Sequence, residues 1–308
     1  MQQDLSAAIF HRGKKLKSDE LLEPLAHCPI CLSTQTRTKE FYIQRDPDVI
    51  LLKCNNCKGC STSRMPTDKA LGDYYGSYYK PQDLKITFHN VERFGSHIYE
   101  MINKEFSSKK VLRILDFGGG DGSLGISLSK MLSLGRESIE VVLVDYNKED
   151  PFEDGIVRFN SYQHVHEVIG AFDIILASAV LEHIPSLHKV LQQLFSILRS
   201  GGSFYARTPY MVPFKRLIKR LDFTFPAHVH DLGPDFWNRL PQLVPLTCEL
   251  QISRAAIVET QWKEAILRTL IAYLLKLPSR VEELFSGKVL LRPFWRYVGG
   301  WEVLLKKL

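Results

Sequence analysis

The chain has 308 residues, of which 45% are apolar and 24% are charged, and its formal net charge is +6. This balance is ordinary for a globular protein with one substantial α/β domain and a small appendage. No apolar run approaches the roughly 18 residues of a membrane span, and the first ten residues lack a secretory layout, so we expect a cytoplasmic protein. The excess of positive charge would suit a phosphate-bearing small molecule, but a solvated basic surface explains it more simply.

Two Cys-x2-Cys pairs lie near the N-terminus, separated by 22 residues. Each pair lets two thiolates converge on one ion, and two pairs complete a tetrahedral zinc site with no open position. We therefore predict structural Zn²⁺ bound by Cys28, Cys31, Cys54 and Cys57. Cys60 and His27 lie close enough in sequence to replace one of these ligands, but we expect them to be bystanders.

The middle of the chain alternates apolar, β-branched runs with helical patterns. This rhythm predicts a parallel sheet with helices on both faces, whose buried strands are continuously apolar. The expected strands are residues 111–117, 139–145, 155–160, 172–178 and 203–209, and the expected helices are residues 122–133 and 187–198.

A glycine-rich loop follows the first of these strands and contains Gly118, Gly119, Gly120 and Gly122. Glycines allow a ligand to approach the backbone closely, and the next helix presents unpaired amides to it. Asp145 ends the second strand, where a carboxylate can accept hydrogen bonds from both ribose hydroxyls. Asp116 precedes the glycines and suits a ligand with a free amino group, whereas it would repel a pyrophosphate. The pattern therefore favours S-adenosylmethionine over NAD.

Asp116–Gly125, Asp145, FDIILASAVLEHIP (172–185) and LRSGGSFYARTP (198–209) resemble the successive motifs of class I S-adenosylmethionine-dependent methyltransferases. The resemblance implies an α/β, Rossmann-like fold with a mostly parallel seven-stranded sheet and helices on both faces. The sequence adds a small N-terminal zinc module and a C-terminal helical insertion. We accordingly divide the chain into residues 1–80, a zinc module with a tyrosine-rich linker, and residues 81–308, the methyltransferase domain.

The resemblance also assigns cofactor contacts. It implies that Asp116 and the glycines hold the amino-acid portion of the cofactor and that Asp145, followed by Tyr146, holds the ribose. Asn160 and Ser161 fall where the family contacts adenine, although an acid is more frequent there. Ser178 and Ala179 are expected beneath the methionine portion.

The segment after Cys57, CNNCKGC…P-x4-LGDYYGSYY, resembles a zinc module fused to methyltransferases that act on sugars, nucleotide-sugars or other biosynthetic products. We expect one or two of its tyrosines, Tyr79 among them, to contact the cofactor or the substrate, since a sulfonium is attracted to an aromatic face. The alternative is that Tyr74, Tyr75, Tyr78 and Tyr79 only pack the module against the main domain.

Three histidines are candidates for the base that a hydroxyl or carbon acceptor requires. His183, in the LEHIP segment, is the first, with a structural histidine as the alternative. His228 and His230 form the second candidate, with Asp231 able to orient a ring. A metal bound by these two histidines lacks an apparent third ligand.

Residues 262–298 resemble a helical insertion between the last two strands, and WEVLLKKL reads as the final strand. The insertion suits a lid or homodimer surface, a helix at a membrane surface, or plain core. The leading function is methyl transfer to a small molecule, such as a sugar, a nucleotide-sugar or a lipid-linked glycan. The alternatives are an RNA methyltransferase, against which the scattered basic residues of the module argue, and a cofactor-binding scaffold without catalysis.

Overall fold

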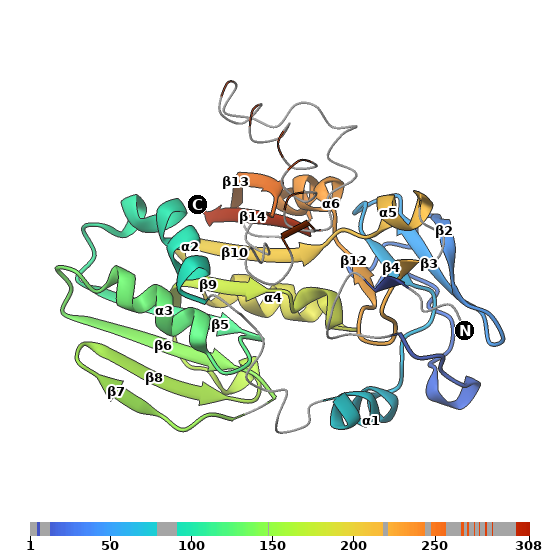
Figure 1. Ribbon diagram of the computed structural model, residues 1–308, viewed down its shortest axis with the longest axis horizontal. Helices are drawn as coiled ribbons and strands as arrows, with labels where there is room; N and C mark the ends of the chain where they lie inside the picture. Colours follow the sequence, from blue (N-terminus) through green and yellow to red (C-terminus); the bar gives the residue numbers. More distant parts are fainter. Residues whose placement is uncertain are drawn as a thin grey trace.

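The computed structural model of the chain describes residues 5–6, 13–78, 91–146, 148–217, 221–243, 248–256 and 300–308, and single positions between 266 and 285. Figure 1 shows a large sheet with helices packed on it, and a smaller sheet beside one end of its strands. Among the described residues, no helix is long and apolar enough to cross a membrane.

The central sheet has eight strands in the order β13-β14-β10-β9-β5-β6-β8-β7. The neighbouring strands from β10 to β8 run parallel, whereas β14, β13 and β7 each run antiparallel to the strand on which they pair. The strands are β5 (Val111–Phe117), β6 (Ser138–Val144), β7 (Phe152–Asp154), β8 (Val157–Tyr162), β9 (Phe172–Ser178), β10 (Leu198–Pro209), β13 (Cys248–Ala255) and β14 (Gly300–Lys307).

Several of these strands differ from the sequence prediction: β10 begins at Leu198 rather than at residue 203, and β6 begins and ends one residue earlier than predicted. The sheet has eight strands rather than seven, because β7 adds a three-residue antiparallel strand at the outer edge. The third parallel strand, β8, begins and ends two residues later than predicted. By contrast, β5 and β9 have the predicted bounds, since both are long apolar runs closed by small residues.

Helices cover both faces of the central sheet. They are α2 (Val91–Phe106), α3 (Ser123–Leu132), α4 (Leu187–Ile197) and α6 (Pro234–Arg239), with short 3-10 turns η2 (Val165–Glu167), η3 (Leu181–His183) and η4 (Leu240–Gln242). Successive strand residues point to opposite faces, so each strand contributes to two cores. Leu112 and Ile114 pack with α2 and α3, while Leu115 and Phe117 pack with α4 and α6.

The N-terminal module forms a four-stranded sheet of order β12-β4-β3-β2. Its fourth strand comes from a much later part of the chain, since β12 (His230–Asp231) pairs with β4 (Cys60–Thr62). The remaining elements are β2 (Arg37–Gln44), β3 (Val49–Cys54), η1 (Ser18–Glu20), α1 (Asp68–Tyr78), α5 (Val212–Leu217), and β1 (Leu5–Ser6), which pairs with β11 (Leu221–Asp222).

We call the contact surface between residues 13–78 and residues 211–243 the seam. One hydrophobic core lies across it and joins Leu51 and Met65 of the module to Phe223, Phe225 and Val229. A second core contains the cysteine pairs together with Phe236 and Trp237. The described part of the module therefore shares its interior with the main domain, although its boundary at residue 80 falls outside the described residues.

The antiparallel pairing of β13 with β14 gives the expected terminal hairpin. The helical insertion predicted at 262–298 lies almost entirely outside the described residues, as does Tyr79.

Candidate functional site

The glycine loop connects the carboxyl end of β5 to α3. Oδ2 of Asp116 accepts a hydrogen bond of 2.9 Å from the amide of Gly125, which ties the end of the strand to the first turn of the helix. A Cβ atom at Gly119 would lie 2.4 Å from the Asp116 carboxyl carbon, so only glycine fits there. Gly118, Gly120 and Gly122 have φ between 64° and 71°, a region that other residues rarely adopt.

Asp116 is a fully buried carboxyl group. Burial raises its pKa to about 7, while the hydrogen bond from Gly125 lowers it and the charges of Asp145 and Asp121 raise it further. Its second oxygen, Oδ1, has no hydrogen-bond partner in the described part of the chain. A buried acceptor without a donor is costly, and a ligand with an ammonium group would supply both the donor and the opposite charge.

Asp145 follows β6 and lies beside the loop. The parallel register pairs Phe117 with Val144, and the amide of Gly118 donates to the Val144 carbonyl at 2.8 Å. Oδ2 of Asp145 accepts a hydrogen bond of 2.9 Å from the amide of Gly120. The two acids that the sequence predicted to act together are thus at the same edge of the sheet, joined by the glycine backbone.

The other predicted cofactor residues differ in their burial and in their position relative to the strand ends. Ser178 is buried at the end of β9, and Ala179 follows it with a φ of 56°. Tyr146 is 76% exposed. Asn160 does not end its strand as predicted: β8 continues to Tyr162, and Asn160 pairs with Val142, short of the carboxyl edge where Asp145 lies. The apolar pattern weakens at Asn160, which made the strand seem to end too early.

A histidine cluster, which we define as Glu182, His183 and His228, lies next to η3. One potential ligand atom from each of the three residues lies within 4.8 Å of the others. The rings of His183 and His228 are 4.8 Å apart. Nδ1 of His228 lies 2.5 Å from Oγ1 of Thr224. The sequence missed Glu182 as a member, although its place beside His183 in the LEHIP segment was the available signal.

The surroundings of His183 define its basic nitrogen. Nδ1 lies 2.9 Å from the carbonyl oxygen of Ala227, which can only accept a hydrogen bond, so we assign the ring proton to Nδ1. Nε2 is then the basic nitrogen of the neutral ring, and it lies 3.7 Å from Oε1 of Glu182. The hydroxyl of Tyr75, from α1 of the module, is 3.1 Å from Nδ1. A module tyrosine therefore contacts this histidine of the main domain.

His230 has a different environment, and its assignment as a catalytic base is corrected. The ring is fully buried, with Nε2 2.8 Å from the carbonyl oxygen of Ile184 and Nδ1 2.9 Å from Oγ of Ser61. Burial lowers its pKa to about 4. Both nitrogens are thus occupied, and His230 links the module to the main domain. Asp231 does not orient a histidine ring either, since its Oδ2 accepts from the amides of Met211 and Val212.

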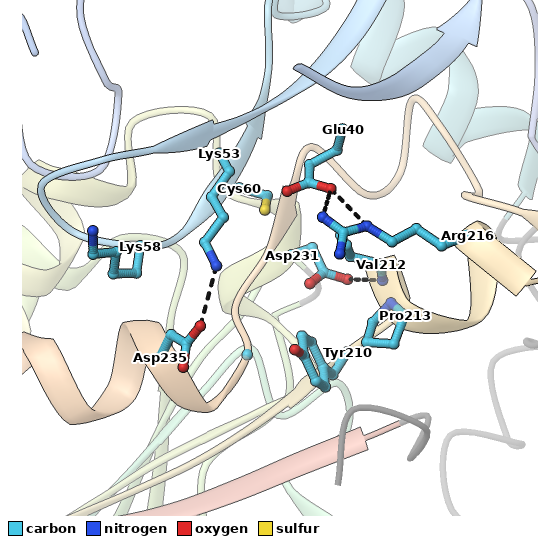
Figure 2. A pocket seen from close by; sticks show the side chains of 11 residues that line it. Glu40, Lys53, Lys58, Cys60, Tyr210, Val212, Pro213, Arg216, Asp231 and Asp235 are labelled. Carbon is cyan, nitrogen blue, oxygen red and sulfur yellow. Dashed lines mark hydrogen bonds and ion pairs between the residues drawn. The ribbon is translucent and has the colours of Figure 1, made fainter. Parts of the chain in front are cut away.

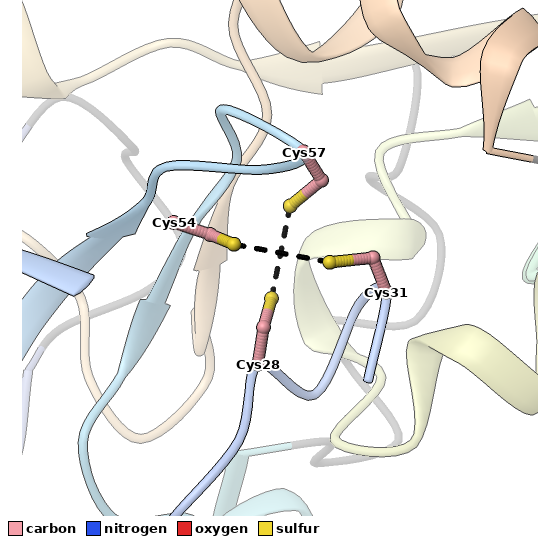
Figure 3. A group of neighbouring side chains, drawn as sticks. All are labelled: Cys28, Cys31, Cys54 and Cys57. Carbon is pink, nitrogen blue, oxygen red and sulfur yellow. Dashed lines mark hydrogen bonds between the residues drawn. The ribbon is translucent and has the colours of Figure 1, made fainter. Parts of the chain in front are cut away.

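The four predicted zinc ligands converge on one point between their sulfur atoms (Figure 3). Sγ of Cys28 is 3.7 Å from Sγ of Cys57, and Sγ of Cys31 is 3.8 Å from Sγ of Cys54, with no disulfide among them. Zn–S bonds of about 2.3 Å in a tetrahedron place sulfurs about 3.8 Å apart, so the cluster has the size of a four-thiolate metal site. Cys60 and His27 are not part of the cluster that the described residues form.

A family model described as "Methyltransferase domain" matches residues 88–240, about half of the chain. This chain carries a class I S-adenosylmethionine-dependent methyltransferase domain. The domain includes the glycine loop, Asp145 and the histidine cluster, whereas the cysteine cluster lies before it.

Curated relatives of the methyltransferase domain are named "Ubiquinone biosynthesis O-methyltransferase, mitochondrial". The protein from Saccharomyces cerevisiae is 27% identical over 131 residues, which are 40% of each chain. The one from Homo sapiens is 28% identical over 147 residues, or 44% of this chain and 38% of the relative. This chain thus matches about two fifths of the length of these relatives. A cytoplasmic location stays a prediction, because these relatives are described as mitochondrial.

Solved methyltransferase structures also resemble the chain. A plantazolicin methyltransferase in complex with a substrate analogue and SAH is 14% identical, with a TM-score of 0.45, and the match covers 77% of this chain and 93% of that one. Coclaurine N-methyltransferase bound to N-methylheliamine and SAH is 14% identical, with a TM-score of 0.41 and coverages of 69% and 70%.

Proposed function

We propose that this protein transfers the methyl group of S-adenosylmethionine to a hydroxyl oxygen of a small molecule. The acceptor class is a sugar, a nucleotide-sugar or a lipid-linked glycan or natural-product intermediate. Two observations beside one edge of the sheet carry the proposal: Oδ1 of the buried Asp116 carboxyl has no donor among the described residues, and the basic nitrogen of His183 is defined.

The residues at the glycine loop suit the cofactor. Asp116 would accept from its amino group, and the loop amides and Asp145 would hold its amino-acid and ribose portions. Ser178 and Ala179, at the end of β9, would lie beneath the methionine portion. When bound, the cofactor supplies an electrophilic methyl group, so most of the acceleration depends on alignment of the acceptor oxygen.

A hydroxyl acceptor must lose its proton during transfer, and His183 is positioned to take it. Its Nδ1 proton is held by Ala227, which leaves Nε2 to act as the base, and Glu182 at 3.7 Å would stabilise the resulting imidazolium. The ring of His228, 4.8 Å away, would help to shape the acceptor pocket. The O-methyltransferase names of the curated relatives favour oxygen as the acceptor atom.

The cysteine cluster would hold Zn²⁺ in a structural role. Four thiolates complete its coordination, so no position remains for a substrate. Three of the four cysteines are buried, and the cluster packs on the second core of the seam. The ion would thereby hold the module, and with it Tyr75, against the main domain.

Titration calorimetry with S-adenosylmethionine tests the first step, and mass-spectrometric detection of methylated product over a panel of sugars, nucleotide-sugars and lipid-linked sugars tests the second. We expect binding in the micromolar range and a mass increase of one methyl group on an acceptor hydroxyl. Absence of binding at millimolar cofactor would refute the proposal. Binding without transfer to any member of the panel would refute the proposed acceptor class.

A further inference from the structure

A second pocket lies on the seam, apart from the histidine cluster. It has a volume of about 180 Å³ and is bounded by module residues of β2 to β4 and by domain residues around β12, α5 and α6 (Figure 2). Successive residues of a strand point to opposite sides. In β12, His230 contacts Ile184 beside η3, whereas Asp231 contacts Met211 and Val212 and lines this pocket.

Asp231 forms the inner wall of the pocket, and its side chain needs a further donor. Only 2% of the residue is exposed. Its Oδ2 accepts from the amides of Met211 at 2.5 Å and Val212 at 3.2 Å, while its Oδ1 has no hydrogen-bond partner among the described residues. Buried polar atoms are nearly always hydrogen-bonded, so this oxygen indicates a donor that is supplied from outside the chain.

The charges around the pocket argue for a neutral ligand. Nζ of Lys53 pairs with Oδ2 of Asp235 at 3.1 Å, and Nε of Arg216 pairs with Oε2 of Glu40 at 2.9 Å (Figure 2). These four charges compensate one another, and the other two charged lining residues, Lys58 and Asp231, have opposite signs. The wall has donors and acceptors in similar number, which suits hydroxyl groups better than it suits a phosphate or an ammonium.

An aromatic ring supplies an apolar wall of the pocket. A Cβ atom at Gly233 would lie 2.2 Å from the ring of Tyr210, so the absence of a side chain at 233 allows this ring to lie against the backbone. Gly233 has a φ of −86°, so the glycine is needed for space rather than for an unusual conformation. The volume is below the roughly 300–1,000 Å³ of sites for drug-sized ligands, which limits the ligand to about one ring.

We propose that this pocket binds a neutral, hydroxyl-rich group of the size of one sugar ring, with a hydroxyl donating to Oδ1 of Asp231 and a C–H face against Tyr210. We take this group to be a unit of the acceptor, remote from the methylated oxygen. That part of the proposal rests on the proposed function. Binding to the pocket itself requires neither the cofactor nor methyl transfer.

Saturation-transfer NMR on the full chain without cofactor tests this proposal. The probes are myo-inositol and the methyl glycosides of glucose, galactose and mannose, at millimolar concentrations because a single ring forms few contacts. We expect at least one probe to bind, and Asp231→Asn to weaken it about tenfold or more. Asparagine keeps an oxygen for the amides of Met211 and Val212 but presents an NH2 group where the ligand needs an acceptor.

Asp154→Asn is the matched control, since Asp154 is an exposed acid of β7 that pairs with Lys130 outside the pocket, and it should change binding by less than about twofold. Gly233→Ala provides a second variant if Asp231→Asn does not fold, because it displaces the Tyr210 ring and should also abolish binding. The proposal is overturned if no probe binds the wild-type chain, or if the folded Asp231→Asn or Gly233→Ala variant binds as the wild type does. Neither result would affect calorimetry with S-adenosylmethionine, so the two proposals fail separately.

Discussion

The glycine loop and the histidine cluster lie in the same domain, but they are assembled differently. The loop and its two acids come from 30 consecutive residues, 116–145, on two adjacent parallel strands. The surroundings of the histidine cluster come from three distant segments, because His183 contacts Ala227 and also Tyr75 of the module. Cofactor binding therefore depends on local backbone geometry, whereas the arrangement of the proposed base depends on how the module docks at the seam.

Loss of the cysteine cluster should produce the largest difference between its effect on cofactor affinity and its effect on methyl transfer. Cys28→Ser should release the metal and destabilise the seam by several kcal/mol, since metal binding contributes as much as about 10–16 kcal/mol to folding in small zinc domains. Methyl transfer should be lost while affinity for S-adenosylmethionine changes little. Metal analysis, calorimetry and a transfer assay measure these effects. Cys248→Ser is the control, because Cys248 is a buried thiol of β13 outside the cluster. Equal loss of cofactor binding would contradict the separation of the two regions.

Replacement of the proposed base should affect only the histidine cluster and not the glycine loop. His183→Gln should lower the rate of transfer about 10²–10⁴-fold, the usual contribution of a general base, with cofactor affinity unchanged. Single-turnover kinetics with saturating cofactor provide the measurement. His164→Gln, at an exposed histidine directly before η2, is the matched control. A rate within a few-fold of wild type would show that His183 is not the base.

His230 should behave as a structural residue rather than a catalytic one. His230→Ala leaves the Ser61 hydroxyl and the Ile184 carbonyl buried without their partner, which should cost about 2–4 kcal/mol in the free energy of unfolding. Denaturant unfolding measures this loss. If the variant keeps its stability but loses transfer, the interpretation of His230 as a link across the seam is wrong.

The smallest expected effect is the pH dependence of cofactor affinity that Asp116 should cause. Its pKa of about 7 means that the free protein holds a proton there at lower pH, and this proton must leave before the carboxylate can pair with the cofactor's ammonium group. Affinity should therefore fall by up to about tenfold per pH unit below pH 7 and become constant just above it. Asp116→Asn should remove this dependence and weaken binding at pH 7.5 by about 1–3 kcal/mol. Calorimetry between pH 5.5 and 7.5 tests both expectations, and a flat profile for the wild type would contradict them.

The sequence predicted the elements whose determinants are local. β5 and β9 are mostly apolar runs, and the loop after β5 needs its glycines at fixed positions, so their pattern is visible in a single chain. The end of β8 was predicted two residues too early because the strand alternates buried and half-exposed residues there, which weakens the apolar signal.

The seam could not be predicted in the same way. Nothing in the segment PAHVHDLGPDFW indicates that His230 pairs with Ser61 while His228 faces His183. Both partners lie far away in the sequence, and of the two histidines only His230 lies in the two-residue strand β12, where it pairs with Ser61. The cysteine spacing predicted a compact cluster, but not that Phe236 and Trp237 of the main domain would pack in its core.

The core shared across the seam has a consequence for how the protein folds during its synthesis on the ribosome. The module is synthesised first, yet Leu51 and Met65 find their apolar partners only when Phe223, Phe225 and Val229 have been added. At about 5–20 residues per second, more than a hundred further residues take on the order of ten seconds. During that interval the apolar residues of the nascent module are exposed to solvent. Early binding of a metal ion by the four cysteines would then protect the module from aggregation until its partner strand has been synthesised.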